Sequence, residues 1–289
     1  MPSSIRIGNQ DLAADVSSLG AEMQALVTND GRSWLWTGDA AYWTGRSPIL
    51  FPIVGKAPDD TVAIDGTLYP MAQHGFARRS EFALAASTPT MCRHELAASA
   101  ATRAVYPFDF LLAVEHAVEG RMLTVTAEVG NRDAKALPFG LGFHPAFAWP
   151  LPGGAGRAHT ISLDNHGEPA LVRLGGGLIN PTMLPSPFDA GRLVLDQAMF
   201  DQDAMIFPEG AGEGLCYGAE GGPTLRFRFE NLPNLALWTK PGAPFICIEP
   251  WHGTAAEAEG SNELSKRPHT TLLAPGATAR FSFTVEILQ

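Results

Sequence analysis

Residues 108–130 read FDFLLAVEHAVEGRMLTVTAEVG, and this stretch decides the fold class. Apolar side chains occupy every other position before and after a turn at residues 119–121. The positions on the shared faces are Phe108, Phe110, Leu112, Val114, His116 and Val118, followed by Leu123, Val125, Ala127 and Val129. Since successive side chains of a strand point to opposite faces, the pattern predicts a hairpin of two strands, each with one buried face.

The same period of two recurs in other parts of the chain. Residues 61–70, TVAIDGTLYP, place Asp65-Gly66 between two short apolar runs, which is a strong hairpin signal. Residues 224–231 and 279–288 also alternate, whereas helix signals are scarce. We therefore predict an all-β fold, a large antiparallel β-sandwich. Without a linker of different composition, residues 1–289 are expected to form a single domain, with loops at 150–157 and 175–189.

Composition and charge exclude several classes of function. The formal net charge of −10 argues against a general nucleic-acid binder, which needs a basic face to neutralise phosphates. The three cysteines, Cys92, Cys216 and Cys247, are an odd number without metal-ligand spacing. The first residues lack the features of a signal peptide, and no apolar run approaches the roughly 20 residues of a membrane span. We expect a cytoplasmic protein with no membrane partner.

Four stretches combine reactive side chains with apolar, turn-rich surroundings. They are SPILFPIVGK (47–56), QHGFARRSEF (73–82), GLGFHPAFAWP (140–150) and FICIEPWHG (245–253). His74 precedes a glycine and His144 precedes a proline, so each histidine is expected in a turn. An imidazole can donate or accept a proton near neutral pH. The alternative for each is a histidine that is simply bonded to the main chain of a turn.

Glu249 follows four apolar residues, and strand alternation places it on the same face as Phe245 and Cys247. A carboxylate that shares a face with apolar groups loses hydration, which raises its pKa toward values useful to a general base. Pro250 restricts the backbone of the glutamate, and Trp251 offers a flat surface for a sugar. The alternative is a glutamate that ends a strand and bonds to the main chain.

Other chemistries lack support in the sequence. There is no HExxH or CxxC pattern, which argues against a zinc site, and no GxSxG turn for a serine nucleophile. Cys247 is expected in the core. A zinc site is therefore not expected, although histidine and glutamate from distant segments could still converge on one.

The four stretches, in this order, resemble those of the aldose 1-epimerase (galactose mutarotase) family, most closely its divergent bacterial branch. Members of that branch carry motifs such as LFPIVG, HGFAR and GFHPYF. The resemblance runs from LGAEMQALV at residues 19–27 to the C-terminal strands. It implies a β-sandwich of the galactose-mutarotase type (supersandwich). It also implies interconversion of the α and β anomers of a free hexose, with no cofactor or metal.

Positions within the motifs imply residue roles. Glu249 would be the general base at the anomeric O1 hydroxyl, and His144 the general acid at the ring oxygen. His74 would bind the sugar and polarise that oxygen. Asp203, in FDQDAMIF (200–207), would hydrogen-bond sugar hydroxyls. Because ring opening removes one proton and delivers another, we expect the carboxylate and the imidazolium to act from opposite sides of the ring.

The sequence departs from the family after FPIVG, where many members have an arginine and this chain has Lys56. Lysine keeps the charge but loses the two-pronged donor geometry, and Arg46 would compensate for the loss. Arg78 also occurs in relatives that act on hexose 6-phosphates. Arg78, Arg79 and Lys56 are therefore a candidate phosphate-binding cluster. Alternatively, Arg78 supports the fold by pairing with a carboxylate.

Three other functions stand beside the epimerase. The first is a hexose-6-phosphate 1-epimerase, and the second is a non-catalytic sugar-binding or regulatory module of the same fold. The third is a carbohydrate-binding domain of a larger polysaccharide-active enzyme. His74, His144 and Glu249 together favour an enzyme, since a binding module needs no acid and base. The expected partner is an aldohexose, with or without a 6-phosphate, and the expected state is a monomer or homodimer. Candidates for stacking on the sugar are Trp251, Trp36, Phe147 and Trp149.

Overall fold

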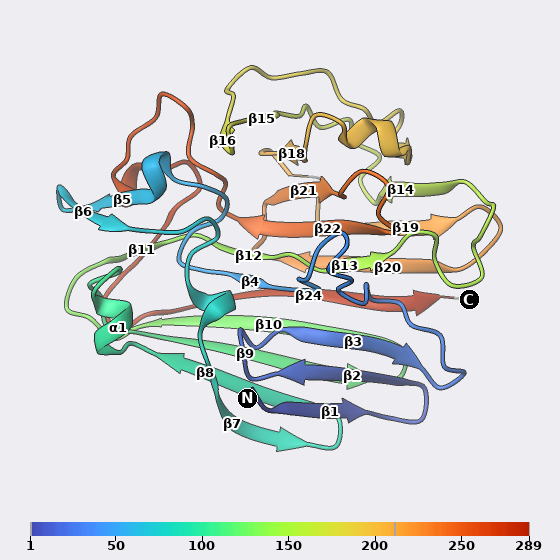
Figure 1. Ribbon diagram of the computed structural model, residues 1–289, viewed down its shortest axis with the longest axis horizontal. Helices are drawn as coiled ribbons and strands as arrows, with labels where there is room; N and C mark the ends of the chain where they lie inside the picture. Colours follow the sequence, from blue (N-terminus) through green and yellow to red (C-terminus); the bar gives the residue numbers. More distant parts are fainter. Residues whose placement is uncertain (1, 211, 289) are drawn as a thin grey trace.

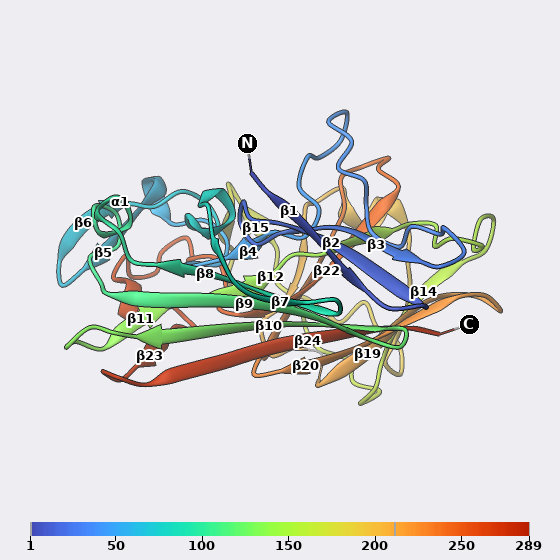
Figure 2. The same cartoon turned by 90° about the horizontal axis from the view of Figure 1, so that it is seen from below.

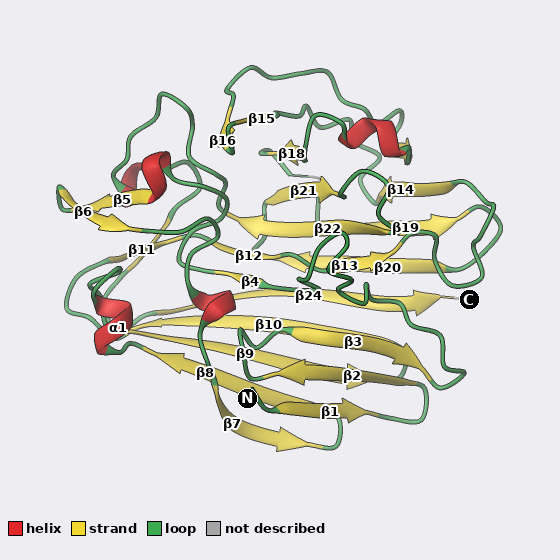
Figure 3. Cartoon of the chain, in the orientation of Figure 1, coloured by secondary structure: helices red, strands yellow, loops and turns green. Residues whose placement is uncertain are grey.

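Antiparallel β-strands arranged in layers make up most of the regular secondary structure, as the computed structural model shows (Figures 1 and 3). It describes residues 2–210 and 212–288. The largest layer is a nine-stranded sheet of order β17-β14-β19-β20-β24-β10-β9-β8-β7. Its strands are β7 (Ala83–Thr88), β8 (Met91–Ala97), β9 (Phe110–Glu119), β10 (Met122–Asn131), β14 (His159–Leu163), β17 (Arg192–Val194), β19 (Gly214–Ala219), β20 (Thr224–Glu230) and β24 (Thr278–Leu288).

Two smaller sheets pack against this layer. The six-stranded sheet consists of β4 (Ile49–Leu50), β12 (Leu141–Phe143), β13 (Ala146–Ala148), β18 (Met205–Phe207), β21 (Asn234–Trp238) and β22 (Phe245–His252). The three-stranded sheet consists of β1 (Ser4–Gly8), β2 (Leu12–Ser17) and β3 (Met23–Thr28), and its first two strands contact β8 and β9 (Figure 2). The predicted antiparallel β-sandwich is therefore confirmed.

Short elements connect the sheets. They are the pairs β5 (Thr61–Ile64) with β6 (Thr67–Pro70), β11 (Leu137–Phe139) with β23 (Thr271–Leu273) and β15 (Leu174–Gly175) with β16 (Leu178–Ile179), the helix α1 (Ala100–Arg103), and the 3₁₀ turns η1 (Pro58–Asp60), η2 (Ala77–Arg79), η3 (Gln197–Phe200) and η4 (Leu264–Lys266). Within the described ranges, no helix is both long and apolar enough to cross a membrane.

Both hairpins expected from the sequence are present. Strands β9 and β10 pair from Glu119 opposite Met122 onward, and Gly120 supplies the left-handed turn with a φ of 55°. Strands β5 and β6 join through Asp65 and Gly66, whose φ angles are 51° and 77°. Two consecutive left-handed residues are what a two-residue hairpin turn needs, which explains why the Asp-Gly pair signals it.

The core between the nine-stranded and six-stranded sheets is rich in aromatic pairs. Phe143 of β12 meets Phe283 of β24, and Phe147 of β13 meets Phe227 of β20, each with ring centroids 5.0 Å apart. Aromatic pairs of this kind add to the burial that joins two layers. Phe147 was a candidate for stacking on a sugar, and that expectation is wrong because its ring is fully buried in this core.

Strand β22 sends alternate side chains into two different environments. Ile246 and Ile248 enter the core between the sheets. Cys247, Glu249 and Trp251 point to the opposite, outer face. The strand continues to His252, so Glu249 lies inside a strand and not at its end, which was the alternative position. A single strand therefore joins the hydrophobic core to the outer surface of the sheet.

A break in the neighbouring ladder makes room for a proline in β22. Strands β12 and β13 both pair with β22, and His144 and Pro145 lie between them. The Ile248 N–H donates to the Pro145 carbonyl at 3.2 Å across this break. By alternation, the nitrogen of Pro250 faces the same side, where the ladder is interrupted and needs no donor. Prolines within sheets are found at such irregular positions.

Candidate active site

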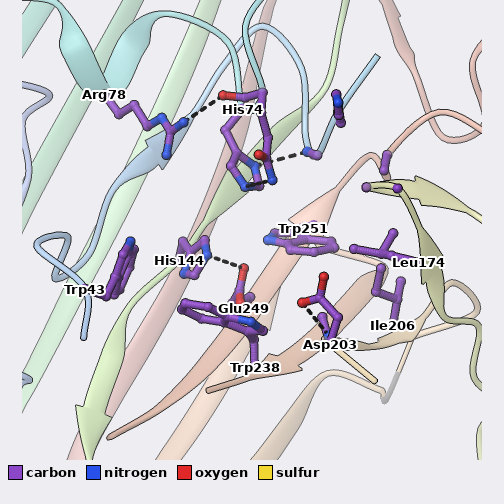
Figure 4. A pocket seen from close by; sticks show the side chains of 17 residues that line it. Trp43, His74, Arg78, His144, Leu174, Asp203, Ile206, Trp238, Glu249 and Trp251 are labelled. Atoms are coloured by element: carbon purple, nitrogen blue, oxygen red, sulfur yellow. Dashed lines mark hydrogen bonds and ion pairs between the residues drawn. The ribbon is translucent and has the colours of Figure 1, made fainter. Parts of the chain in front are cut away.

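A cavity of about 440 Å³ lies on the outer face of the six-stranded sheet (Figure 4). Its floor comes from strands, with Glu249 and Trp251 on β22, Trp238 on β21 and Ile206 on β18. Its walls come from loops that are far apart in sequence. The wall residues are Trp43, Gly55, Lys56, Gln73, His74, Arg78, His144, Leu174, Gly176, Gly177, Asp203, Ala204 and Ala255.

Glu249, on the floor of this cavity, is in direct contact with His144 on its wall. The Nε2 atom of His144 lies 3.2 Å from Oε2 of Glu249, and both side chains are buried. Burial raises the pKa of Glu249 well above its ordinary value, and the charge of Asp203 raises it further. Burial lowers the pKa of His144 to about 3. Both shifts favour the same uncharged arrangement, with one proton on the carboxyl group and a neutral imidazole.

The contact between the two groups bears on the expected arrangement of acid and base. The two groups expected on opposite sides of a sugar ring lie side by side here, 3.2 Å apart. The ring oxygen and the O1 hydroxyl of an aldose are both bonded to the anomeric carbon. A side-by-side pair on one side of that carbon can reach both oxygens.

Aromatic rings enclose His144. Its ring stacks on Trp43 with centroids 4.9 Å apart and an interplanar angle of 31°, and it meets Trp238 edge-on at 5.7 Å. Its Nδ1 atom is buried without a hydrogen-bond partner among the described residues. Neither tryptophan is among the site residues predicted from the sequence. The sequence does contain an indication of Trp238, because Leu235 and Leu237 of the same strand point into the core and alternation places Trp238 on the opposite face.

His74 lies in a turn, as expected, and its backbone is left-handed with a φ of 65°. The Gly55 N–H donates to His74 Nδ1 at 3.1 Å, and the His74 N–H donates to the Gly55 carbonyl at 2.8 Å. A neutral imidazole that accepts at Nδ1 carries its proton on Nε2. Burial lowers the pKa of His74 well below its ordinary value, with smaller contributions from His144 and Arg78. His74 is thus a neutral ring with an N–H at Nε2.

The amide nitrogen of Gln73 lies 3.4 Å from this Nε2 atom. An amide nitrogen is a donor and does not accept the proton on Nε2 of His74, so this N–H stays available to a ligand. The next turn begins at Gly75, where a Cβ atom would lie 2.1 Å from the Phe51 carbonyl oxygen, so only glycine fits.

Four of the five residues expected to bind substrate line the cavity, namely Lys56, Arg78, Asp203 and Trp251. Arg46 does not, and that expectation is wrong. Its Nε atom donates to the Thr37 carbonyl at 2.8 Å and its NH1 atom contacts Gln24, which turns the guanidinium away from the cavity. Trp36 and Trp149, the remaining stacking candidates, also lie outside the lining.

Arg78 is held by the main chain. Its NH2 atom donates to the Gln73 carbonyl at 2.9 Å, and in the described part of the chain no carboxylate lies within 4.0 Å of its guanidinium. The alternative of a fold-supporting ion pair for Arg78 is therefore wrong. A second hollow of about 450 Å³ opens beside it, lined by Lys56, Gln73, Arg78 and Arg79 among others. Lys56, Gln73 and Arg78 are shared with the main cavity.

The loop expected over residues 175–189 contributes more than a connection. It begins in the small β15–β16 hairpin, and Gly176 and Gly177 line the cavity next to Lys56. Asp203 likewise comes from an irregular segment, where its φ is 67° and Arg173 donates to its carbonyl at 2.7 Å. Nothing in these sequences indicates where the loops fold back, because their positions depend on distant contacts.

One group of donor atoms could converge on a metal ion. His144, Cys247 and Glu249 place a nitrogen, a sulfur and an oxygen within 4.8 Å of one another. Burial raises the pKa of the Cys247 thiol well above its ordinary value, so the sulfur is protonated, and its residue packs in a cluster with Trp36 and Phe245. A metal here would occupy the same atoms that a proton transfer between His144 and Glu249 requires.

Comparisons with known proteins agree with this architecture. A family model described as aldose 1-epimerase matches residues 3–284. The protein LacX of Lactococcus lactis subsp. lactis is 29% identical over 297 residues, which cover 98% of this chain and 99% of LacX. A galactose mutarotase-like protein from Lactobacillus casei superposes with a TM-score of 0.92 at 28% identity, covering 99% of this chain and 100% of that one. A galactose mutarotase related enzyme from Lactobacillus acidophilus superposes with a TM-score of 0.94 at 24% identity, covering 99% and 98%, and confirms the fold alone.

Proposed function

The chain belongs to the aldose 1-epimerase family, and on that basis we propose that it interconverts the α and β anomers of a free aldohexose. The observation that carries this proposal is the buried contact of 3.2 Å between His144 and Glu249. Ring opening of a hemiacetal requires one proton to leave O1 and one to reach the ring oxygen. A pair that holds a single proton between an acid and a base can do both.

The reaction begins when the shared proton lies on His144, which leaves Glu249 as a carboxylate. Glu249 then takes the O1 proton while the imidazolium of His144 gives its proton to the ring oxygen. The bond between C1 and the ring oxygen breaks, and O1 becomes the aldehyde oxygen. The pair ends uncharged, with a protonated Glu249 and a neutral His144. Burial favours this uncharged state, as the pKa directions of both groups indicate, so the resting pair is uncharged and the ion pair from which ring opening starts is its minor, reactive form.

Reclosure uses the same two groups in reverse. After rotation about the C1–C2 bond, His144 removes the proton from the ring-oxygen hydroxyl and Glu249 returns its proton to O1. The N–H at Nε2 of His74 is available to the ring oxygen. Asp203 and Lys56 line the cavity where sugar hydroxyls would lie, and Trp251 offers a face to the apolar side of the ring. A non-catalytic sugar-binding module would need these contacts but not the proton-transfer pair.

The hollow beside Arg78 supports a second candidate, epimerisation of a hexose 6-phosphate. Lys56, Arg78 and Arg79 border it, and it joins the main cavity through the first two. Guanidinium groups bind phosphate oxygens well. Asp60 also borders the hollow and opposes an anion there. The free sugar is therefore the first candidate and the phosphorylated sugar the second.

A polarimetric assay with free galactose, free glucose and glucose 6-phosphate tests the proposed function. We expect the enzyme to accelerate anomerisation of the free sugars, and KM for them to be unchanged in Arg79→Gln, because Arg79 borders only the second hollow. If glucose 6-phosphate is the preferred substrate, Arg79→Gln should raise KM for it alone. An absence of acceleration with all three sugars would contradict an epimerase of aldohexoses.

The pH profile should reflect the single proton of the pair. Adding a second proton requires a pH near the pKa of His144, about 3, whereas removing the only proton requires a pH above the raised pKa of Glu249. We expect kcat/KM to stay constant from about pH 5 up to the raised pKa of Glu249 and to fall at higher pH. The measurement is initial polarimetric rates after subtraction of the buffer-catalysed rate. A fall on the acid side near 6.5, the ordinary pKa of histidine, would contradict a buried neutral His144.

A further inference from the structure

Arg267 is a buried cation behind the wall of the cavity. Only 6% of the residue is exposed, and none of the described carboxylates lies within 4.0 Å of its guanidinium. Burial lowers its pKa to about 10, so it is still charged at neutral pH. Its NH2 atom donates to the carbonyl oxygens of Thr254 at 2.9 Å, Val54 at 3.1 Å and, more weakly, Lys56 at 3.4 Å.

One of these contacts leads directly to the cavity. The carbonyl of Val54 and the N–H of Gly55 belong to the same planar peptide unit. That carbonyl accepts from Arg267 at 3.1 Å, and that N–H donates to Nδ1 of His74 at 3.1 Å. A single amide therefore stands between the buried guanidinium and the imidazole that lines the cavity.

The charge of Arg267 acts on both ends of this amide. A cation at the carbonyl oxygen polarises the peptide and strengthens its N–H as a donor, because hydrogen bonds in a chain reinforce one another in a buried site. A stronger donor at Nδ1 of His74 disfavours a proton on that nitrogen. The proton of the neutral ring is then confined to Nε2, the nitrogen left for the cavity.

We propose that Arg267 is a positioning residue that fixes the tautomer of His74 through the Val54–Gly55 peptide. The use of the resulting Nε2–H on a sugar rests on the proposed function, but the tautomer itself does not. Arg267 never reaches the cavity and acts only through the amide.

A simpler role for Arg267 is to hold two loops together. Its three carbonyl partners lie in residues 54–56 and at Thr254, and these loops are also joined by a bond from the Ala256 N–H to the Lys56 carbonyl at 3.0 Å. If Arg267 only held the two loops together, replacing it would lower the stability of the fold without changing the tautomer of His74. The state of the His74 ring therefore separates the two roles.

The experiment is nuclear magnetic resonance of protein labelled with ¹⁵N at histidine, where nitrogens with and without a proton have distinct shifts. The His74 signals are assigned by their loss in His74→Gln. In the unmodified protein we expect a protonated Nε2 and an unprotonated Nδ1. In Arg267→Met both signals should move to intermediate shifts as two tautomers exchange, and kcat/KM should fall about tenfold. Arg267→Lys, which keeps the charge, should restore the original tautomer.

Arg121→Met is the matched control, because Arg121 also donates to a main-chain carbonyl, that of Ile287 at 3.1 Å, in the turn between β9 and β10. It should leave the His74 signals unchanged. A folded Arg267→Met protein with an unaltered Nε2–H tautomer would overturn the proposal. If that variant does not fold, a folded Arg267→Lys with mixed tautomers would overturn it equally. Because the spectra need no substrate, a failure of the proposed function leaves this test intact.

Discussion

The variant E249Q should lower kcat for anomer interconversion by about a thousandfold, within the range of 10²–10⁴ typical of a positioned acid or base. Glutamine keeps the shape of Glu249 on the floor of the cavity but cannot accept the O1 proton. The fold should be unharmed. Above pH 4.5 the unfolded chain ionises this carboxyl whereas the folded protein, with its raised pKa, keeps it protonated, so Glu249 reduces stability at neutral pH. Glutamine removes that loss, and the melting temperature should stay constant or rise.

Polarimetry and thermal unfolding on the same preparation check both parts of this prediction. The control is E230Q, which changes a carboxylate on β20 that accepts from Ser282 at 2.8 Å in the far sheet. It should leave kcat unchanged. Activity of E249Q within a few-fold of the unmodified protein would rule out Glu249 as the general base.

The variant H144Q should lower kcat by a similar factor, since the ring oxygen loses the group that protonates it. Glutamine cannot carry the proton between the two oxygens, although it can still donate a hydrogen bond. The substitution also removes the ring that stacks on Trp43 at 4.9 Å, so near-ultraviolet circular dichroism should change at the tryptophan bands while far-ultraviolet signals stay the same.

The double variant H144Q/E249Q tests whether the two residues work as one unit. Residues that share a single proton transfer lose their function together, so the double variant should be no slower than the slower single variant by more than a few-fold. Effects that multiply would show that the two groups act in independent steps. The uncatalysed rate, measured without protein, sets the floor of this comparison.

Local patterns in the sequence predict the strands and the face that carries the base. The turn residues Asp65 and Gly120 and the alternation of residues 245–251 specify backbone geometry within a few positions, so Glu249 could be assigned from the sequence alone to the strand face that carries Phe245 and Cys247. The roles of Glu249, His144 and His74 come from the resemblance to a family, and remain predictions for this chain.

The rest of the site depends on contacts between distant segments. Trp43 contacts His144, which lies far from it in the sequence. Arg267 and Val54 are 213 positions apart in the sequence. The periodicity of the sequence does not indicate such pairs, because each segment can keep its local strand or turn geometry in several different tertiary arrangements. The expectation that Arg46 binds substrate is wrong for the same reason. Its position in the motif is close to the cavity, but its side chain donates hydrogen bonds to Thr37 and Gln24.

The floor of the cavity is made of strands and its walls are made of loops, so the two parts tolerate substitutions to different extents during evolution. The proton-transfer pair depends on paired strands β12, β13 and β22, where a substitution disturbs the core of the sandwich. The glycines after Leu174 belong to an exposed segment of the kind that accepts insertions and exchanges, whereas Lys56 and Arg78 are half-buried. For the proposed reaction, preference for one sugar over another could therefore be changed by exchanging this loop while the paired strands that carry His144 and Glu249 stay the same.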